Sequence, residues 1–481
     1  MDIIKNGYSV ISILNVLLAI AVIFLERRNV GVTWAWMMVL LFLPGVGFIL
    51  YLILGQNLSR RKIYRLKDDK RRIVDTLVEQ QKEDLRMNRI PYHDPDTADY
   101  QDMIYMNLSS AYALYTQDNE VEIFTDGNEK FDALLRDIRE AKDHVHIMYF
   151  IIRNDSLGQR LVDALTEKAR QGVQVRLLYD DIGCSSLPRR FFHNLREAGG
   201  SVAAFFPSRI PYVNLRVNYR NHRKLVIIDG QIGYVGGFNV GNEYLGLSRR
   251  FGYWRDTHLK LAGGSVLHMQ ALFFLDWGIA TGDQVLIEPR YFPLGQHPGR
   301  VGMQIVSSGP DSEWQQIKNA YLKMIVNAKE HIYIQTPYFI PDESLITALK
   351  MAALSGVDVK IMIPSKPDHK LVYWASFSYI GELLQCGVQC YLYEKGFLHA
   401  KTIVTDGKIA TVGTANIDIR SFKLNFEVNA FIYDTETAVK LKETFENDML
   451  HSRWLTLTAY ERRPLLHKFR EPCARLLSPI L

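Results

Sequence analysis

Two histidines in this chain are each followed by the same arrangement of lysine, aspartate, glycine and asparagine. The first copy runs from His222 to Asn239 and the second from His399 to Asn416, and both fit the pattern H-x-K-x4-D-x6-G-x-x-N. A neutral imidazole can attack phosphorus to give a phosphohistidine, and a second, protonated imidazole can give its proton to the departing alkoxide. The doubled pattern therefore predicts phosphodiester chemistry through a histidine nucleophile, with no metal.

The lysine of each motif lies two positions after the histidine, at Lys224 and Lys401. Side chains alternate along an extended strand, so we expect each lysine on the same side as its histidine, within reach of phosphate oxygens. Asn239 and Asn416 add neutral donors for the charge that develops on pentacoordinate phosphorus. We predict that these four side chains bind the phosphate.

Each histidine needs a partner that fixes its tautomer and stabilises its charged form, as carboxylates do in hydrolase triads. Asp256 follows the first motif and Glu427 follows the second, and we expect one carboxylate to serve each half. The motif aspartates, Asp229 and Asp406, stand just before a glycine. We count them among the catalytic motif residues, but we expect them to brace the turn and the neighbouring backbone.

A single copy of the motif would suit an exposed strand that ends in an Asp-Gly turn. The chain has 13 histidines in 481 residues, so two copies with matching downstream glycine and asparagine are hard to obtain by accident. The repetition favours the functional interpretation.

A wider internal repeat surrounds the motifs. Residues 141–147 are similar to 328–334, and residues 161–178 are similar to 345–362. Each unit reads as a helix, a buried strand, a second helix and a strand after a Gly-Val turn, which is typical of crossover units and predicts a mostly parallel sheet. We expect an α/β fold with two similar lobes that face each other.

The amino terminus is more apolar than the rest of the chain. Uncharged stretches at about 8–25 and 30–54 are each long enough to cross ~30 Å of hydrocarbon, which predicts two transmembrane helices. A cleaved signal peptide is the alternative for the first stretch, but no small-x-small site precedes the charged turn at 26–28. Pro44-Gly45 predicts a kink or a short re-entrant element in the second stretch, which leaves full crossing open.

Positive charge near these stretches predicts their orientation. The short turn carries Arg27 and Arg28, whereas a longer run of arginines and lysines follows between 60 and 72. Positive flanks stay cytoplasmic, so we expect the lobes on the cytoplasmic side. The segment from 59 to about 87 suits either anionic lipid or a solvated helical linker.

Two further stretches have an interfacial composition. Residues 205–217 interleave arginine with bulky apolar groups, as in a lip that enters lipid headgroups or in an ordinary packed loop. The carboxyl-terminal stretch is basic and amphipathic, and both a helix on the bilayer and an ordinary packed helix fit it. The predicted organisation is a membrane hairpin at 1–57, a charged linker and connecting segment at 58–115, lobes at 116–300 and 301–450, and a C-terminal segment at 451–481.

The motifs resemble those of the phospholipase D superfamily, in which two such motifs form one active site. The resemblance extends along nearly the whole chain to bacterial cardiolipin synthases with two membrane helices, and no motif position departs from the family pattern. The segments that carry it are 26–29, 33–36, 218–224, 241–244, 254–258, 335–339 and 474–479.

This resemblance implies two phospholipase D-like lobes with one active site, which transfers a phosphatidyl group from one phosphatidylglycerol to another and releases glycerol. By the family's usual order, His222 is the nucleophile and His399 is the general acid and then the base. The implied partners are phosphatidylglycerol, cardiolipin and an anionic membrane surface, without a cofactor. The implied location is the bacterial cytoplasmic (inner) membrane. The sequence does not decide whether the protein is a monomer or a homo-oligomer.

Other activities fit the same residues. Water as the acceptor would give phospholipase D hydrolysis, and phosphatidylethanolamine is an alternative donor. The net charge of +5 suits nucleic acid and anionic lipid alike. A membrane-tethered nuclease is disfavoured because no aromatic and basic strand pattern for stacking bases is present, so we expect no nucleic acid partner. A lipid-binding scaffold without chemistry is disfavoured because both motifs are complete.

Overall fold

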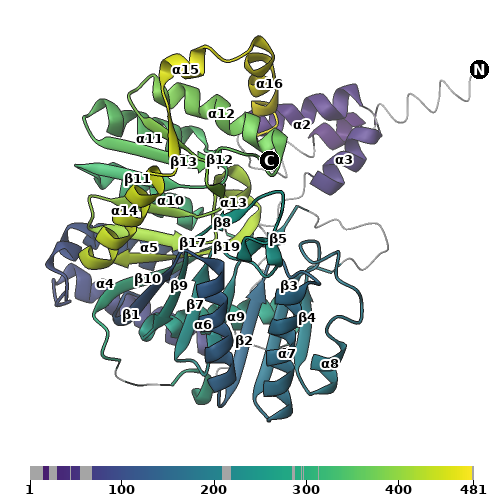
Figure 1. Cartoon of the computed structure of the whole chain (residues 1–481), viewed down its shortest axis with the longest axis vertical. Coiled ribbons are helices and arrows are strands. Elements are labelled where there is room, and N and C mark those ends of the chain that lie inside the picture. The colour runs from purple at the N-terminus through teal and green to yellow at the C-terminus, as the bar shows by residue number, and fades with distance from the viewer. Residues whose placement is uncertain are drawn as a thin grey trace, which may run out of the picture.

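A continuous mixed sheet runs through both lobes of the computed structural model (Figure 1). The model describes residues 13, 15–20, 30–43, 45–54, 68–207, 218–283, 288–293, 295, 297–312 and 314–478. From the centre outward, the first lobe contains β1 (Thr116–Phe124), β9 (His258–Ala262), β7 (Ile232–Gly236), β6 (Leu225–Ile228), β2 (His144–Tyr149), β3 (Gln174–Asp180) and β4 (Ser201–Phe205).

The second lobe repeats this order. From the centre outward it contains β10 (Val301–Ser308), β19 (Asn425–Tyr433), β17 (Ile409–Gly413), β16 (Thr402–Thr405), β11 (His331–Gln335), β13 (Asp358–Pro364), β14 (Gln389–Tyr393) and the extra edge strand β20 (Ser452–Leu455). The lobes meet where β1 pairs antiparallel with β10. The internal repeat of the sequence is therefore a repeat of strand order about this junction.

The predicted mostly parallel sheet is wrong. Strands β2, β3 and β4 run parallel, as do β11, β13 and β14, and these are the crossover units that the repeat indicated. The motif strands form the hairpins β6–β7 and β16–β17 instead, and strands β9 and β19 continue the antiparallel pairing. Strands joined by so short a turn can pair only antiparallel.

Three equivalent pairs of helices, one of each pair in either lobe, pack on the sheet. The first lobe has α6 (Gly127–Glu140), α7 (Ser156–Arg170) and α9 (Gly264–Thr281), and the second has α10 (Gln316–Asn327), α11 (Glu343–Leu354) and α14 (Thr435–Met449). Four of them begin at an aspartate whose carboxylate accepts backbone N–H groups of the first turn, which stabilises a helix N-terminus. Shorter or peripheral elements of the two lobes are α8 (His193–Glu197), η2 (Asn242–Leu245), η3 (Pro289–Tyr291), β12 (Phe339–Ile340), α12 (Lys370–Leu384), β18 (Ile417–Asp418), α13 (Ile419–Lys423), α15 (Leu457–Glu461) and α16 (Leu465–Arg475).

Two short strands cross from one lobe to the other. Strand β5 (Arg220–Asn221), just before His222, pairs parallel with β19 of the second lobe. Strand β15 (Gly396–Leu398), just before His399, pairs parallel with β8 (Tyr253–Arg255) of the first lobe. These crossings place both motifs at the junction.

The segment predicted as a charged linker belongs, over its described part, to the second lobe. It forms α4 (Asp68–Arg86), η1 (Pro95–Tyr100) and α5 (Gln101–Ala111). Val78, Leu85 and Ile104 are buried in the apolar core of the second lobe. An apolar residue every three or four positions was the signal of this packing, and the high charge of the outer face concealed it.

The second predicted membrane stretch forms two helices, α2 (Val30–Phe42) and α3 (Val46–Leu54), rather than one. The rings of Trp36 and Tyr51 lie 5.3 Å apart, whereas 15 residues of one helix would separate them by ~22 Å, so α3 folds back on α2. Among the described residues, no helix is both long and apolar enough to cross a membrane. Most of the predicted span at 8–25, the basic residues at 60–67 and most of the predicted lip lie outside the described residues.

Candidate active site

Each motif histidine is paired with a carboxylate of the opposite lobe. His222 Nδ1 lies 2.9 and 3.0 Å from the two carboxylate oxygens of Glu427. His399 Nδ1 lies 2.6 Å from Asp256 Oδ2. All four side chains are buried. We expected one carboxylate for each half, and the structure adds that the pairing is crossed, so neither lobe alone contains a complete histidine–carboxylate pair.

Backbone pairing explains the crossing. The His222 N–H donates to the carbonyl of Phe426, the residue before Glu427, at 2.9 Å. The His399 N–H donates to the carbonyl of Arg255, the residue before Asp256, at 2.7 Å. These bonds continue the pairings of β5 with β19 and of β15 with β8. In both halves the histidine N–H thus bonds the residue that precedes the carboxylate, and in both the carboxylate belongs to the other lobe.

The two carboxylates are held differently. Glu427 accepts hydrogen bonds from Thr414 Oγ1 at 2.6 Å and from Asn425 Nδ2 at 3.2 Å. At the position equivalent to Thr414, the first motif has Gly237, where a Cβ atom would lie 1.9 Å from Asp256 Oδ1. Thr414 was not among the predicted site residues, because it stands at a variable position of the G-x-x-N motif, which carries no signal for a threonine.

Two buried arginines brace the same region, and no sequence pattern predicted this role. Arg223 Nη1 lies 2.6 Å from both carboxylate oxygens of Asp276, and Arg223 Nε donates to the carbonyl of Glu427 at 3.1 Å. Arg255 Nε donates to Asp448 Oδ1 at 3.0 Å. Asp276 lies in the second half of α9 and Asp448 lies in the last turn of α14, and these helices are equivalent. In each lobe, therefore, an aspartate on a helix binds an arginine next to the site and holds it in place.

The motif lysines are anchored beside their histidines. Lys224 Nζ donates to the carbonyl of His222 at 2.6 Å, and Lys401 Nζ donates to the carbonyl of His399 at 2.5 Å. Both lysines are buried. Burial holds the pKa of Lys224 well below its ordinary value and lowers the pKa of Lys401 to about 8.

Burial also lowers the pKa of His222 to about 4, with Glu427 opposing the shift and Lys224 adding to it. Burial and Lys401 lower the pKa of His399 to about 4, against the attraction of Asp256. Although burial opposes ionisation of both carboxyl groups, their histidine partners hold the pKa of Asp256 and of Glu427 below the ordinary values. Burial, with the neighbouring lysines adding to it, thus keeps both imidazoles neutral at pH 7, and the lysines leave the site suited to an anion.

The motif asparagines are buried in the scaffold around the histidines. Asn239 Oδ1 accepts the N–H of Ile151 at 3.1 Å, and Asn239 Nδ2 donates to the hydroxyl of Tyr244 at 3.1 Å. The Asn416 N–H donates to Ser421 Oγ at 3.2 Å. Asn416 Oδ1 has no hydrogen-bond partner among the described residues. Tyr244 joins the site through Asn239 and stands in one of the segments that carry the family resemblance.

The motif aspartates lie at the far end of the motif strands. Asp229 and Asp406 both have φ 54° and precede a glycine of positive φ, the geometry of a type I′ hairpin turn. The carboxylate of Asp229 accepts the N–H groups of residues 142, 143 and 144 at 2.8, 2.8 and 2.9 Å. The carboxylate of Asp406 accepts those of residues 329, 330 and 331 at 2.9, 2.8 and 2.9 Å. Both side chains brace the start of a neighbouring strand.

We predict that Asp229→Ala destabilises the protein by about 1–3 kcal/mol. The substitution leaves three backbone N–H groups without their acceptor. It also puts alanine at a positive φ, where aspartate is tolerated because its side chain forms local hydrogen bonds. Thermal unfolding of the full chain checks this. Asp229→Asn keeps one acceptor and tolerates the turn, so it should lose less. Normal stability with lost turnover in Asp229→Ala would contradict the bracing role.

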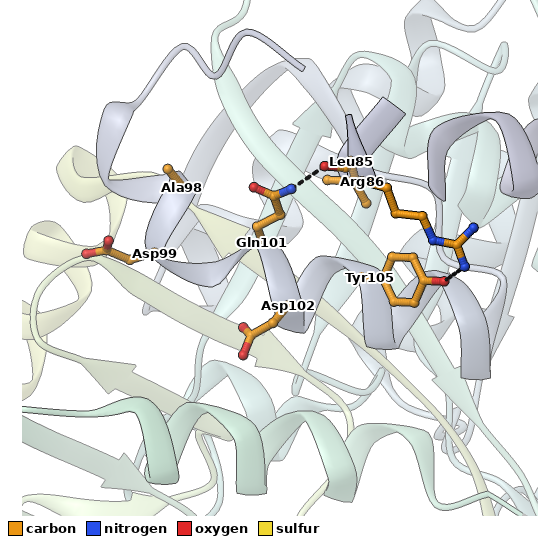
Figure 2. Close-up of a pocket in the computed structure, with 7 residues that line it drawn as sticks. All are labelled: Leu85, Arg86, Ala98, Asp99, Gln101, Asp102 and Tyr105. Atoms are coloured by element: carbon orange, nitrogen blue, oxygen red, sulfur yellow. Dashed lines mark hydrogen bonds between the residues drawn. The ribbon is translucent and has the colours of Figure 1, made fainter. Parts of the chain in front are cut away.

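A surface pocket between α4 and α5 lies apart from the motifs (Figure 2). Arg86 reaches across it to the hydroxyl of Tyr105, and Gln101 donates to the carbonyl of Leu85. Its lining residues are Leu85, Arg86, Ala98, Asp99, Gln101, Asp102 and Tyr105. None of them belongs to a motif, so this pocket has no part in the chemistry described above.

Two models of known protein families match this chain. The model described as "Cardiolipin synthase, PLD-like domain" matches residues 134–250 and 321–449, one segment in each lobe. The model described as "Phospholipase_D-nuclease N-terminal" matches residues 13–56.

Individual relatives are similar over nearly the whole chain. The major cardiolipin synthase ClsA of Bacillus subtilis is 56% identical over 474 residues, which is 98% of either chain. A cardiolipin synthase of Oceanobacillus iheyensis is 55% identical over 469 residues, again 98% of either chain. Among solved structures, phosphatidylserine synthase of Haemophilus influenzae superposes with a TM-score of 0.58 at 16% identity, covering 75% of this chain and 95% of that one. This last likeness concerns the fold alone.

Proposed function

The chain belongs to the family of bacterial cardiolipin synthases with phospholipase D-like domains, and from this premise we propose that it works through a phosphohistidine on His222. It is a phosphatidyltransferase of phospholipid biosynthesis that forms cardiolipin. The donor and the acceptor are both phosphatidylglycerol, and glycerol is released. The observation that carries the mechanism is the crossed pairing of each histidine with a buried carboxylate.

In the first half-reaction, His222 Nε2 attacks phosphorus. An ionised carboxylate only accepts hydrogen bonds, so Glu427 holds the proton on His222 Nδ1 and leaves the Nε2 lone pair for the substrate. The N–P bond forms as the bond from phosphorus to the glycerol oxygen breaks. His399 gives its proton to that oxygen, and Asp256 stabilises the imidazolium before transfer.

The substrate itself supplies the protonation state that this step requires. With the site empty, the pKa of His399 is about 4, so this imidazole is neutral. A phosphodiester anion in the same low-dielectric site raises the pKa of the nearby imidazole and offsets the charge of Lys224 and Lys401. In the second half-reaction, His399 takes the proton of the acceptor glycerol hydroxyl, whose oxygen displaces His222 from phosphorus. The enzyme then returns to its starting state.

We predict a bell-shaped dependence of kcat on pH. Turnover falls on the acid side as His222, whose pKa burial lowers, becomes protonated and loses its attacking lone pair. It falls on the alkaline side as His399, whose pKa the bound phosphodiester raises, loses the proton for the leaving oxygen. Lys401, with its pKa of about 8 in the empty site, loses the charge that holds the phosphate on the same side. Initial rates at saturating phosphatidylglycerol between about pH 4 and pH 10 check this, and Lys401→Gln should keep a bell shape because His399 still titrates. A flat profile across that range would contradict the assignment.

We also place the enzyme at the cytoplasmic membrane, with its lobes on the cytoplasmic side. Both lipid substrates reside in a bilayer, and the apolar residues 13–56 match the N-terminal family model. The arginines and lysines between 60 and 72 support the cytoplasmic side.

Product analysis tests the proposed transfer. Purified protein in vesicles receives phosphatidylglycerol labelled in its free glycerol as the only lipid substrate, with His222→Ala alongside. The proposal predicts one labelled glycerol released for each cardiolipin formed, and neither product with the variant. Phosphatidic acid in place of cardiolipin would identify water as the acceptor and contradict the proposal.

A further inference from the structure

Helix α16, the last helix of the described residues, exposes its apolar side chains and buries polar and small ones. Its exposed side chains are apolar, with exposed fractions of 82% for Leu465, 70% for Phe469 and 81% for Leu476 just after the helix. These positions, i, i+4 and i+11, share one face. The face turned to the protein carries Glu471, which is 2% exposed, and the small side chains of Ala474 and Ser478.

Polar contacts fix this orientation. Glu471 pairs with Arg463, whose Nε and Nη2 lie 3.0 and 2.6 Å from its carboxylate oxygens. Ser478 accepts the hydroxyl of Tyr379 on α12 at 3.1 Å, and Arg475 pairs with Glu382 of the same helix. Turning the helix over would leave a buried carboxylate without its partner, at high cost. An ordinary packed terminal helix would bury its leucines, whereas α16 packs on α12 with its polar and small side chains inward.

The charge around the apolar face is positive. Lys468 and Arg470 flank it on α16, and Arg462 precedes the helix. None of the three forms an ion pair with a carboxylate of the described residues, and Arg470 stacks over the ring of Trp374 instead. The only acid of α16 is Glu471, which faces inward. An apolar strip edged with cations matches an anionic lipid surface.

The position of α16 agrees with such a surface. Figure 1 shows α16 at the same end of the molecule as α2 and α3. These helices also expose large apolar side chains, among them Leu41, Phe42 and Val46. α16 packs along α12, which begins just after Asp368, and the carboxylate of Asp368 contributes to the pKa of Lys401 in the catalytic site. The strip is thus linked through one helix to the vicinity of the motifs.

We propose that the outward face of α16 docks on the anionic membrane surface as a second lipid contact, separate from the N-terminal apolar region. Leu465, Phe469 and Leu476 enter the acyl boundary, while Lys468 and Arg470 meet lipid phosphates. The inference rests on the proposed function only for the nature of the surface, because phosphatidylglycerol is anionic. Docking at this point holds the catalytic lobes against the bilayer from which both substrates come.

A native cysteine beside the strip supplies the probe. Cys473 is exposed, whereas Cys184 and Cys390 are buried. In full-length protein with the half-buried Cys386 replaced by serine, an environment-sensitive fluorophore on Cys473 reports on α16. In vesicles of phosphatidylcholine and phosphatidylglycerol we expect a blue-shifted emission and quenching by brominated acyl chains. In vesicles of phosphatidylcholine alone, quenching should be at least about threefold weaker.

Matched variants separate docking from folding and from chemistry. The triple variant Leu465→Gln, Phe469→Gln, Leu476→Gln should lose most of the quenching, yet keep its turnover on short-chain phosphatidylglycerol in micelles. Met351→Gln with Leu354→Gln removes equally exposed apolar groups from α11 and should change neither readout. His222→Ala should dock normally, which distinguishes failure of docking from failure of the proposed chemistry.

Three results would overturn the docking proposal. The first is an unquenched probe in vesicles that contain phosphatidylglycerol. The second is equal quenching with and without the anionic lipid. The third is a probe already shielded in lipid-free detergent, because α16 would then be covered by the N-terminal segment or by a second copy of the chain.

Discussion

His222→Ala should lower the rate of cardiolipin formation by at least about 10⁴-fold, which is the scale of loss when a covalent nucleophile is removed. No other described side chain can take over, because His399 faces the opposite carboxylate and is needed for proton transfer. Glu427 would be left buried beside Lys224, so the variant should still fold. The measurement is kcat on phosphatidylglycerol in vesicles, with thermal unfolding as the check on folding.

A matched control is His193→Ala, which removes an exposed histidine whose one ion pair within the described part of the chain is with Glu197 on the surface. This control should keep full activity. Retention of more than about 1% of the normal rate by His222→Ala, in protein that unfolds normally, would remove His222 from the role of nucleophile.

The second large effect is expected for His399→Ala, and it should depend on the leaving group. Glycerol leaves as a strongly basic alkoxide, so loss of the proton donor should slow the first half-reaction by about 10²- to 10⁴-fold. A phosphatidyl ester of p-nitrophenol releases a weakly basic phenolate that needs no proton. Release of p-nitrophenol by His399→Ala should therefore occur at close to the rate of the unaltered enzyme, in a single burst.

The burst should stop after one turnover, because the second half-reaction needs His399 to activate the acceptor hydroxyl. His222→Ala is the control, since it should give no burst with either leaving group. Equal losses for both leaving groups in His399→Ala would show that this histidine holds the site together and does not transfer protons.

The sequence indicated the histidines, lysines and carboxylates that the structure brings together, but neither their pairing nor the residues that brace them. The two motifs fix the identity of the histidines and lysines because the chemistry demands those residue types at that spacing. The crossing of Glu427 to His222 arises from strand pairing between residues more than 200 positions apart, and no local pattern encodes it. The same holds for Arg223 and Asp276, whose contact depends on how α9 packs.

Local patterns also failed where tertiary packing decides which face of a helix is buried. Periodicity predicts that α4 and α16 are amphipathic, but not against what they pack. The apolar face of α4 lies in the core of the second lobe, although the segment precedes the first lobe in the chain. In α16 the apolar face points outward, because Glu471 and Ser478 are bound on the inner side.

In the apolar N-terminal region, too, the sequence pattern predicted the composition of a segment but not how it folds. Composition identified an apolar stretch at 30–54, and Pro44-Gly45 indicated its interruption. The structure has two helices there, α2 and α3, where a kink or a short re-entrant element was predicted and full crossing was left open.

The most direct test of the phosphohistidine mechanism is to trap the intermediate. Enzyme mixed with phosphatidylglycerol that carries ³²P is quenched in denaturant at alkaline pH within one turnover, digested, and mapped by mass spectrometry. The mechanism predicts an acid-labile phosphatidyl group on the peptide that contains His222, absent in His222→Ala and accumulating in His399→Ala with the p-nitrophenyl ester. Label on His399, or label that survives in His222→Ala, would contradict it.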